Sequence, residues 1–218
     1  MKYALIAAAA VAAVSSTSAM AQDAAPVGGF HVEGVVGYDS TRAKVTYEDT
    51  AFPADNFDES GHSDGVLYGV DAGYDFAMGS NTIGVELGYE LTDNKRCEEL
   101  FGGDALCASL KRNLYAGIKG STALATNTSL TVGIGYVNGR ARLSYSDPSA
   151  PANNVADSDS RDGYRLSAGL EQRFGGNFFG KLEYRYSDYK DYKYVDGTES
   201  IGLGFSRHQV VAGLGVRF

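Results

Sequence analysis

Histidines are the side chains in this 218-residue sequence best suited to acid–base chemistry. His62 is followed by Ser63 and Asp64, and His208 lies two residues after Ser206, so each offers part of a Ser-His-acid hydrolase site. Neither histidine stands in a recognisable nucleophile motif, and residues adjacent in sequence need not form a triad. We therefore expect no enzymatic activity, with a lipid-modifying enzyme as a minor alternative.

A single pair of cysteines is the next candidate for chemistry. Cys97 and Cys107 are an even pair close in sequence, which in an exported protein is usually a disulfide. Such a bond would stabilise the fold by roughly 2–3 kcal/mol in the chain-entropy model. A metal site is the alternative, but no histidine or further cysteine lies nearby, so we expect no metal and no cofactor.

The N-terminus has the features of a secretory signal peptide. Lys2 precedes an apolar run at 5–14, and small residues lead to Ala19-Met20-Ala21, an A-x-A cleavage site. A membrane anchor is the alternative, but the run is too short to span a bilayer. We expect a signal peptide at 1–21, cleavage between Ala21 and Gln22, and one mature domain at 22–218.

The net charge of the chain limits the classes of partner that it can bind. The formal net charge is −8 with no basic tract, which argues against nucleic acid. After the signal there is no apolar run of about 18 residues that could form a transmembrane helix. A chain of this kind can cross a membrane only as a closed β-barrel, because a barrel satisfies every backbone polar group without helices.

Period-two alternation is the strongest structural signal in the mature chain. Apolar residues alternate with glycine, small or charged residues, and each stretch is about ten residues long, as a tilted transmembrane strand requires. The pattern predicts an all-β fold, an eight-stranded antiparallel up-and-down transmembrane β-barrel. The expected strands lie at 30–39, 66–76, 83–91, 110–119, 130–136, 164–174, 178–187 and 209–218.

The links between these segments alternate in length. Short links are expected at 77–81, 122–127 and 175–177, and long polar loops near 40–64, 92–109, 140–161 and 188–206. With both termini in the periplasm, this is the arrangement of short periplasmic turns and longer extracellular loops in outer-membrane barrels.

Aromatic residues decide which face of the barrel is apolar and faces lipid. The strands of a soluble lipocalin-like carrier also alternate apolar and polar residues, with the apolar face inward. Nothing in such a carrier would place the aromatic side chains at two separate levels along the barrel axis. Here the rings form two belts, as the two bilayer interfaces select. The periplasmic belt is Phe30, Phe76, Phe174, Phe178 and Phe218, and the outer belt is Tyr38, Tyr68, Tyr89, Tyr136, Tyr164 and Tyr186.

Charged residues on the opposite face should fill the lumen. Charges at membrane depth must pair or stay wet, so we expect a network of ion pairs that plugs the barrel. A thin water path with a charge filter is the alternative. The expected network is Glu33, Asp71, Glu86, Lys111, Lys119, Arg165, Glu171, Arg173, Lys181, Glu183, Arg185 and Arg217, whereas Arg112 falls on the apolar face.

The signal peptide, the eight alternating segments and the terminal Gly-Val-Arg-Phe at 215–218 together resemble a known family. They are similar to the small OmpA/OmpX-type barrels, and most similar to opacity-type and porin-family outer-membrane proteins. The resemblance covers the mature chain and implies a Gram-negative outer-membrane location. It also implies that the C-terminal strand ending in Phe218 contacts the barrel-assembly machinery.

The function we expect is structural and surface-interactive. A monomeric barrel with a plugged lumen would support the outer membrane and present four extracellular loops to lipopolysaccharide, host surfaces or other cells. The alternative is a narrow porin for small solutes or ions. That alternative requires a continuous water path past the layer of Lys181, Glu183, Arg185 and Glu86.

Overall fold

Alternating residues give this chain long extended strands that pair antiparallel with their sequence neighbours. The computed structural model describes residues 27–99, 104–150 and 154–218, so the expected cleavage between Ala21 and Gln22 lies outside the described residues. A short 3-10 helix, η1 (Pro53–Asp55), interrupts the link between the first two strands. The strands are β1 (Gly29–Asp49), β2 (Phe57–Met78), β3 (Asn81–Thr92), β4 (Lys95–Glu99), β5 (Ala105–Ala125), β6 (Thr128–Ser146), β7 (Val155–Arg173), β8 (Phe178–Asp196) and β9 (Glu199–Arg217).

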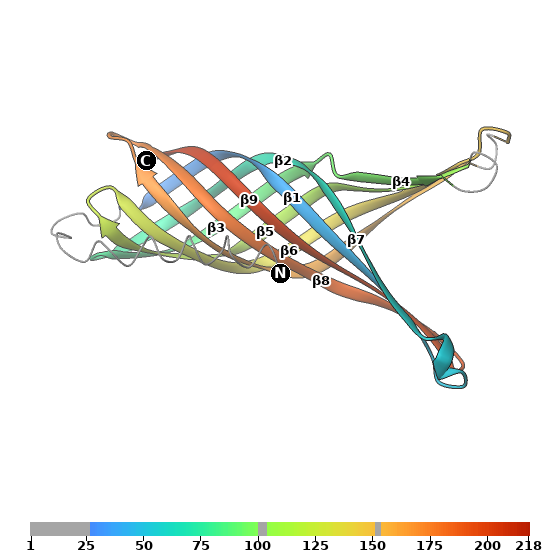
Figure 1. Ribbon diagram of the computed structural model, residues 1–218. Helices are drawn as coiled ribbons and strands as arrows, with labels where there is room; N and C mark the ends of the chain where they lie inside the picture. The colour runs from blue at the N-terminus through green and yellow to red at the C-terminus, as the bar shows by residue number, and fades with distance from the viewer. Residues whose placement is uncertain (1–26, 100–103, 151–153) are drawn as a thin grey trace.

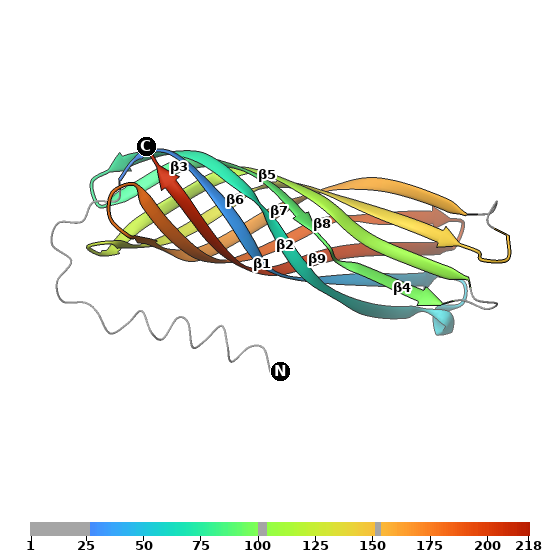
Figure 2. The same ribbon diagram turned by 90° about the horizontal axis from the view of Figure 1, so that it is seen from above.

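The strands close into a ring with eight walls (Figures 1 and 2). Each strand pairs with its neighbours in sequence, β1 closes on β9, and β3 pairs with β5. The short β4 pairs with β5 beyond the end of β3 and continues the same wall. Each of the eight expected segments lies essentially within one wall, which confirms the eight-stranded antiparallel barrel.

One end of the barrel is closed by tight turns. Gly79, at a φ of +65°, turns β2 into β3, and Gly175 and Gly176, at +88° and +55°, turn β7 into β8. A side chain is rarely tolerated at such φ values, so glycine suits these corners. The three short links lie where the sequence predicted them, and we call this end the turn end.

The long links are different from the prediction. The sequence indicated polar loops near 40–64, 92–109, 140–161 and 188–206, but most of these residues continue the strands. β1 and β2, for example, stay paired to Tyr47 and Phe57. The prediction was wrong because polar residues dilute the alternation there, whereas backbone hydrogen bonds alone can extend an antiparallel ladder.

The barrel divides at the end opposite the turns. Pairing of β7 with β8 stops at Gly163 and Tyr189, and pairing of β2 with β3 stops at Leu67 and Thr92. Beyond these points the strands form two projections, visible in Figure 1. The first projection is the outer part of β8, β9, β1 and β2, and the second is β4 with the outer parts of β5, β6 and β7.

The two faces of the barrel wall are opposite in character. Leu182 on the outer face is 58% exposed, whereas its neighbour Lys181 is 4% exposed in the lumen. A soluble carrier would have its apolar face inward, so this arrangement excludes the lipocalin-like alternative. None of the helices in the described part of the chain is long and apolar enough to cross a membrane.

Candidate functional site

The lumen is crossed by ion pairs centred on Arg185 of β8. Its guanidinium donates to Glu90 of β3 at 2.5 Å, to Asp71 of β2 at 2.7 Å and to Glu183 at 2.5 Å. Arg165 of β7 adds a bidentate bond to Glu90, at 2.6 and 2.8 Å. Paired, two-point contacts of this kind are the strongest guanidinium–carboxylate geometry. They join four walls of the ring at one level.

Lys181 forms the next layer toward the turn end. Its Nζ lies 2.5 Å from Glu33 Oε1, 3.6 Å from Glu183 Oε2 and 3.7 Å from Glu86 Oε2. Glycine makes room for these side chains, because a Cβ added at Gly213 would lie 2.6 Å from Glu33 Oε2. Small residues at inward positions therefore let long charged side chains from neighbouring walls meet in the lumen.

A third layer lies closest to the turns. The buried His31 places Nδ1 3.5 Å from Asp75 and Nε2 3.3 Å from the Lys119 ammonium. Arg217, from the last strand, donates to Asp75 at 3.0 Å and to Glu171 at 2.8 Å. This layer ties the C-terminal strand to β2 and β7, across the seam where β1 closes on β9.

A fourth layer faces the projections. Arg207 donates to Asp39 at 2.5 and 3.1 Å and to the Tyr189 hydroxyl at 3.4 Å. Tyr189 donates in turn to Asn113 at 3.1 Å, and Asn113 donates to Glu90 at 3.1 Å. Hydrogen bonds thus connect the outermost layer to the pairs around Arg185.

The four layers, defined here as the lumen network, hold more carboxylates than cations. All of these side chains are buried, and an unpaired buried charge is costly. The buried carboxylates are Glu33, Asp39, Asp71, Asp75, Glu86, Glu90, Glu171 and Glu183, and the buried cations are Lys119, Lys181, Arg165, Arg185, Arg207 and Arg217. Eight carboxylates thus face six cations, and the His31 imidazole lies among the same layers.

Two predicted members lie outside this network. Lys111 is exposed, because a bulge between Leu110 and Asn113 shifts the register of β5 against β6 and ends the simple alternation there. Arg173 lies at the turn end and donates to the backbone carbonyl of Thr126 at 2.9 Å. Assigning these two residues to the network was wrong, while the other ten predicted residues lie buried within it.

Several network residues were missing from the prediction. The sequence pattern places three of them, Glu90, Asp39 and Asp75, on the inward face of their strands. It does not show which cation each of them contacts. Arg207 was missed because the last strand was expected to begin two residues later. His31 shares the parity of Glu33 and could have been included on that basis.

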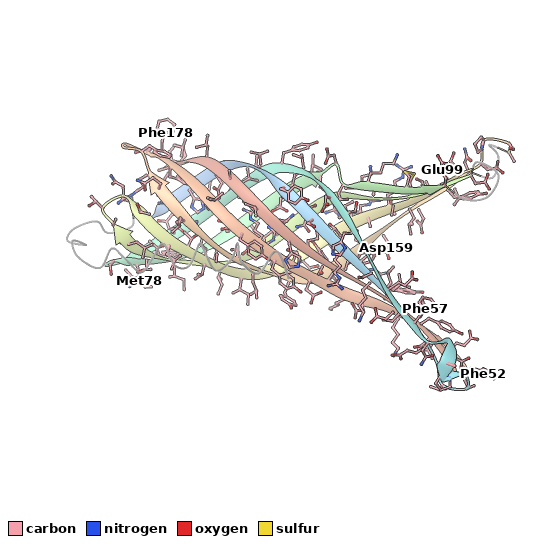
Figure 3. All side chains as sticks on the ribbon, in the orientation of Figure 1. Phe52, Phe57, Met78, Glu99, Asp159 and Phe178 are labelled. Carbon is pink, nitrogen blue, oxygen red and sulfur yellow. A yellow bond between two sulfur atoms is a disulfide. The ribbon has the colours of Figure 1, made fainter. Side chains whose placement is uncertain are left out.

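All eleven belt residues lie on the outer face or at its rims, and ten of them are exposed large side chains. Tyr186 is half-buried against His208, with ring centroids 5.0 Å apart. Phe178 lies at the turn end in Figure 3. That the two belts mark the two bilayer interfaces stays a prediction.

The two candidate hydrolytic histidines, His62 and His208, lie on different strands, β2 and β9. His208 points outward, and its Nδ1 lies 2.6 Å from the Tyr184 hydroxyl. His62 faces Arg42 in the register of β1 with β2, in the first projection. His31 is enclosed by the charges of the lumen.

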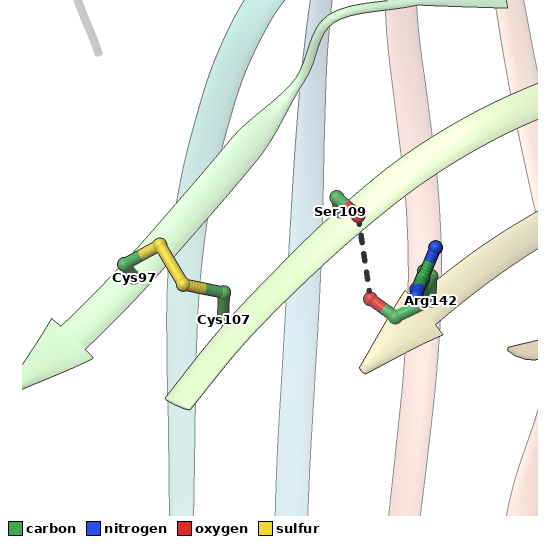
Figure 4. Close-up of a disulfide and its surroundings, with 4 residues drawn as sticks. All are labelled: Cys97, Cys107, Ser109 and Arg142. Atoms are coloured by element: carbon green, nitrogen blue, oxygen red, sulfur yellow. Dashed lines mark hydrogen bonds between the residues drawn. A yellow bond between two sulfur atoms is a disulfide. The ribbon is translucent and has the colours of Figure 1, made fainter. Parts of the chain in front are cut away.

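The disulfide fixes the second projection (Figure 4). Cys97 of β4 and Cys107 of β5 face each other in the ladder, with Cα atoms 4.0 Å apart. Because β4 pairs only with β5, this bond attaches an edge strand to the rest of the projection. The neighbouring Ser109 hydroxyl lies 3.5 Å from the backbone carbonyl of Arg142, as Figure 4 shows.

Known outer-membrane proteins are similar to this chain in sequence. The model of the outer membrane protein beta-barrel domain family matches residues 9–218. The chain is 28% identical over 165 residues to a 22 kDa outer membrane protein of Rhizobium leguminosarum bv. viciae, a stretch that covers 75% of this chain and 71% of that protein.

Solved structures include similar barrels. The outer membrane protease OmpT of Escherichia coli has a TM-score of 0.51 and 12% identity, covering 93% of this chain and 100% of that one. Neisserial surface protein A has a TM-score of 0.47 and 14% identity, covering 87% and 97%. At these identities the likeness concerns the fold alone.

Proposed function

Because this chain belongs to the outer membrane protein beta-barrel domain family and is located in the Gram-negative outer membrane, we propose that it is a surface-interaction barrel with a closed lumen. The observation that carries the proposal is the set of direct ion pairs between opposite walls. β8 and β3 are four walls apart in either direction around the ring, yet Arg185 and Glu90 are 2.5 Å apart.

Closure follows from the small size of the ring. An eight-stranded barrel has an interior that side chains can just fill. Where side chains from opposite walls are in hydrogen-bond contact, no water can pass directly between them. The lumen network then acts as a permanent cross-brace, and its charges remain at membrane depth because they are paired.

The two projections supply the surface for interaction. They extend beyond the level at which the barrel divides, and Figure 3 shows Phe52 and Phe57 on the first and Glu99 on the second. We propose that the turn end faces the periplasm and the projections face outward, toward lipopolysaccharide, host surfaces or other cells. We also propose a monomer that is inserted by the barrel-assembly machinery through the strand ending in Phe218.

A narrow pore is the second candidate, favoured by one observation. Four buried carboxylate oxygens, Glu33 Oε2, Asp71 Oδ1, Asp75 Oδ1 and Glu86 Oε2, make no hydrogen bond within the described part of the chain. Water threaded between the layers would satisfy them. A pore lined by eight carboxylates and six permanent cations would favour cations.

Liposome swelling tests the proposal. Liposomes containing the refolded barrel, verified by heat-modifiable gel mobility, are diluted into isosmotic arabinose. Closure predicts swelling no faster than in protein-free liposomes. Faster swelling that scales with the amount of protein would support the pore instead. A non-catalytic role further predicts that lipid extracts of these liposomes remain unchanged after incubation.

A further inference from the structure

A pocket lies at the outer mouth of the lumen, where two walls depart from regular pairing. The register of β5 with β6 shifts between Leu110 and Asn113, and that of β8 with β9 shifts between Tyr189 and Tyr192. Bulges of this kind redirect side chains and are frequent at functional sites. The pocket is lined by Thr41, Leu110, Arg112, Gly139, Arg140, Ala141, Arg161, Tyr189, Phe205 and Arg207.

The floor of the pocket is apolar and shaped by a glycine. A Cβ added at Gly139 would lie 2.8 Å from the Tyr189 ring, so glycine lets this ring approach β6 closely. Phe205 packs against the buried cluster that contains Tyr189. The cavity of about 40 Å³ exceeds the roughly 10–15 Å³ that one water molecule needs.

Arginines surround this apolar floor in a protein of net charge −8. Arg207 is neutralised by Asp39, and Arg161 pairs with Asp159 at 2.5 Å while its guanidinium lies 5.2 Å from the Tyr192 ring centroid. The other two, Arg112 and Arg140, have no carboxylate partner among residues 27–99, 104–150 and 154–218.

The bulge explains why Arg112 reaches this pocket. The sequence places Arg112 on the apolar outer face. In the ladder with β3 it lies two pairs beyond the pair of Tyr89 with Leu114. In the structure it is half-buried and lines the mouth, because Lys111 and Arg112 together lie opposite a single residue of β6 between the paired Leu110 and Asn113. Arg140 lies on β6 opposite this bulge.

We propose that this pocket binds a small amphipathic anion, a carboxylate, sulfate or phosphate ester attached to an apolar group. The guanidinium groups of Arg112 and Arg140 take the anionic group, since their planar donors match its oxygens. The apolar group lies against Leu110, Tyr189 and Phe205. The proposal goes beyond surface interaction in general and does not depend on whether the lumen conducts.

The test uses naphthalene-2-sulfonate and the full barrel in nanodiscs of zwitterionic lipid. Saturable binding above a nanodisc blank is measured by saturation-transfer NMR and calorimetry. We expect the double variant R112Q/R140Q to lower the association constant about tenfold or more. The matched control R142Q removes an exposed arginine of β6 outside the pocket and should bind like the wild type.

Two further ligands separate the contribution of the anionic group from that of the apolar group. The neutral 2-naphthol and inorganic sulfate should each bind more weakly, because each has only half of the recognition chemistry. Equal binding of 2-naphthol, equal binding by R112Q/R140Q, or no saturable binding would overturn the proposal.

A parallel arm adds lipid A to the nanodiscs. Displacement of the probe by lipid A, lost in R112Q/R140Q, supports the same site with a membrane phosphate as its ligand. Unchanged probe binding supports a ligand from the external medium. Heat-modifiable mobility of each variant verifies folding, and G139A, which crowds Tyr189, is a second variant expected to weaken binding without removing charge.

Discussion

Arg185 and Glu90 form an ion pair of 2.5 Å between strands on opposite sides of the barrel. Glu90 also holds Arg165, so one carboxylate joins two guanidinium groups from β7 and β8 to β3. A contact of this kind fixes the diameter of the ring at that level. Closure of the lumen should therefore depend on the Glu90 carboxylate more than on any other side chain.

Glu90→Gln should strongly destabilise the barrel. The substitution keeps the shape of the side chain but leaves two buried guanidinium groups without their shared carboxylate, which costs about 3–5 kcal/mol. The free energy of unfolding in urea, measured in lipid vesicles, tests this. The matched control is Asp58→Asn, which breaks the 2.7 Å pair with Lys44, both partners more than half exposed, and should cost under about 1 kcal/mol. Equal effects of the two substitutions would contradict the network's role.

Replacing both cysteines by serine should loosen the second projection and leave the barrel intact. Cys97 and Cys107 join only β4 to β5, beyond the end of β3, so the bond constrains a local hairpin. Amide hydrogen exchange in β4 should accelerate, while the heat-modifiable shift stays as in the wild type. Reduction of the wild type should reproduce the change, and a loss of the whole barrel on reduction would refute a local role.

A charged side chain on the outer face should destabilise the barrel most when it lies midway between the two aromatic belts. Leu182 lies halfway along β8 between Phe178 and Tyr186, so Leu182→Arg should destabilise by about 2–4 kcal/mol and Phe178→Arg by about 0–1 kcal/mol. Urea unfolding in vesicles compares the two variants. If the penalties are equal, or larger at Phe178, the proposed interfacial belts are placed wrongly.

The hydroxyl of Tyr145, in the second projection, should lose its proton at a higher pH than an ordinary tyrosine. Its hydroxyl donates to Asp104 at 2.6 Å, and this bond raises the pKa of Tyr145 to about 12 from 10.0. The folded-state pKa is the higher one, so the stabilisation is complete below pH 10 and is lost as the pH rises toward 12. NMR titration of ring-labelled tyrosine should show one resonance shifting earlier in Asp104→Asn, and an unchanged profile would argue against the bond.

Much of the fold was predictable because lipid imposes a strict pattern. Outward positions such as Leu182 and Leu214 must be apolar, and inward positions such as Lys181 and Gly213 must fit a narrow lumen, so parity alone assigned them. Outside the bilayer that constraint disappears. The outer parts of β1 and β9 were therefore interpreted as loops, although their backbones remain paired.

The candidate site was predictable in composition but not in connectivity. Parity placed Glu90 and Asp75 inward, yet which cation reaches each one depends on strand stagger, which one sequence does not fix. The bulge that exposes Lys111 and redirects Arg112 has no clear marker in the sequence. A single extra residue therefore changed two assignments and formed the anion-binding pocket proposed above.

Single-channel recording of the refolded wild type in planar bilayers tests the central claim most directly. We expect no steady current, because Arg185 and Lys181 bridge opposite walls of the lumen. Joint truncation of the bridge in Glu90→Ala/Arg185→Ala should introduce openings, whereas Lys44→Ala/Asp58→Ala in the projection should not. Steady, reproducible openings of the wild type that change when Lys181 or Arg185 is neutralised would contradict the closed lumen and identify a pore.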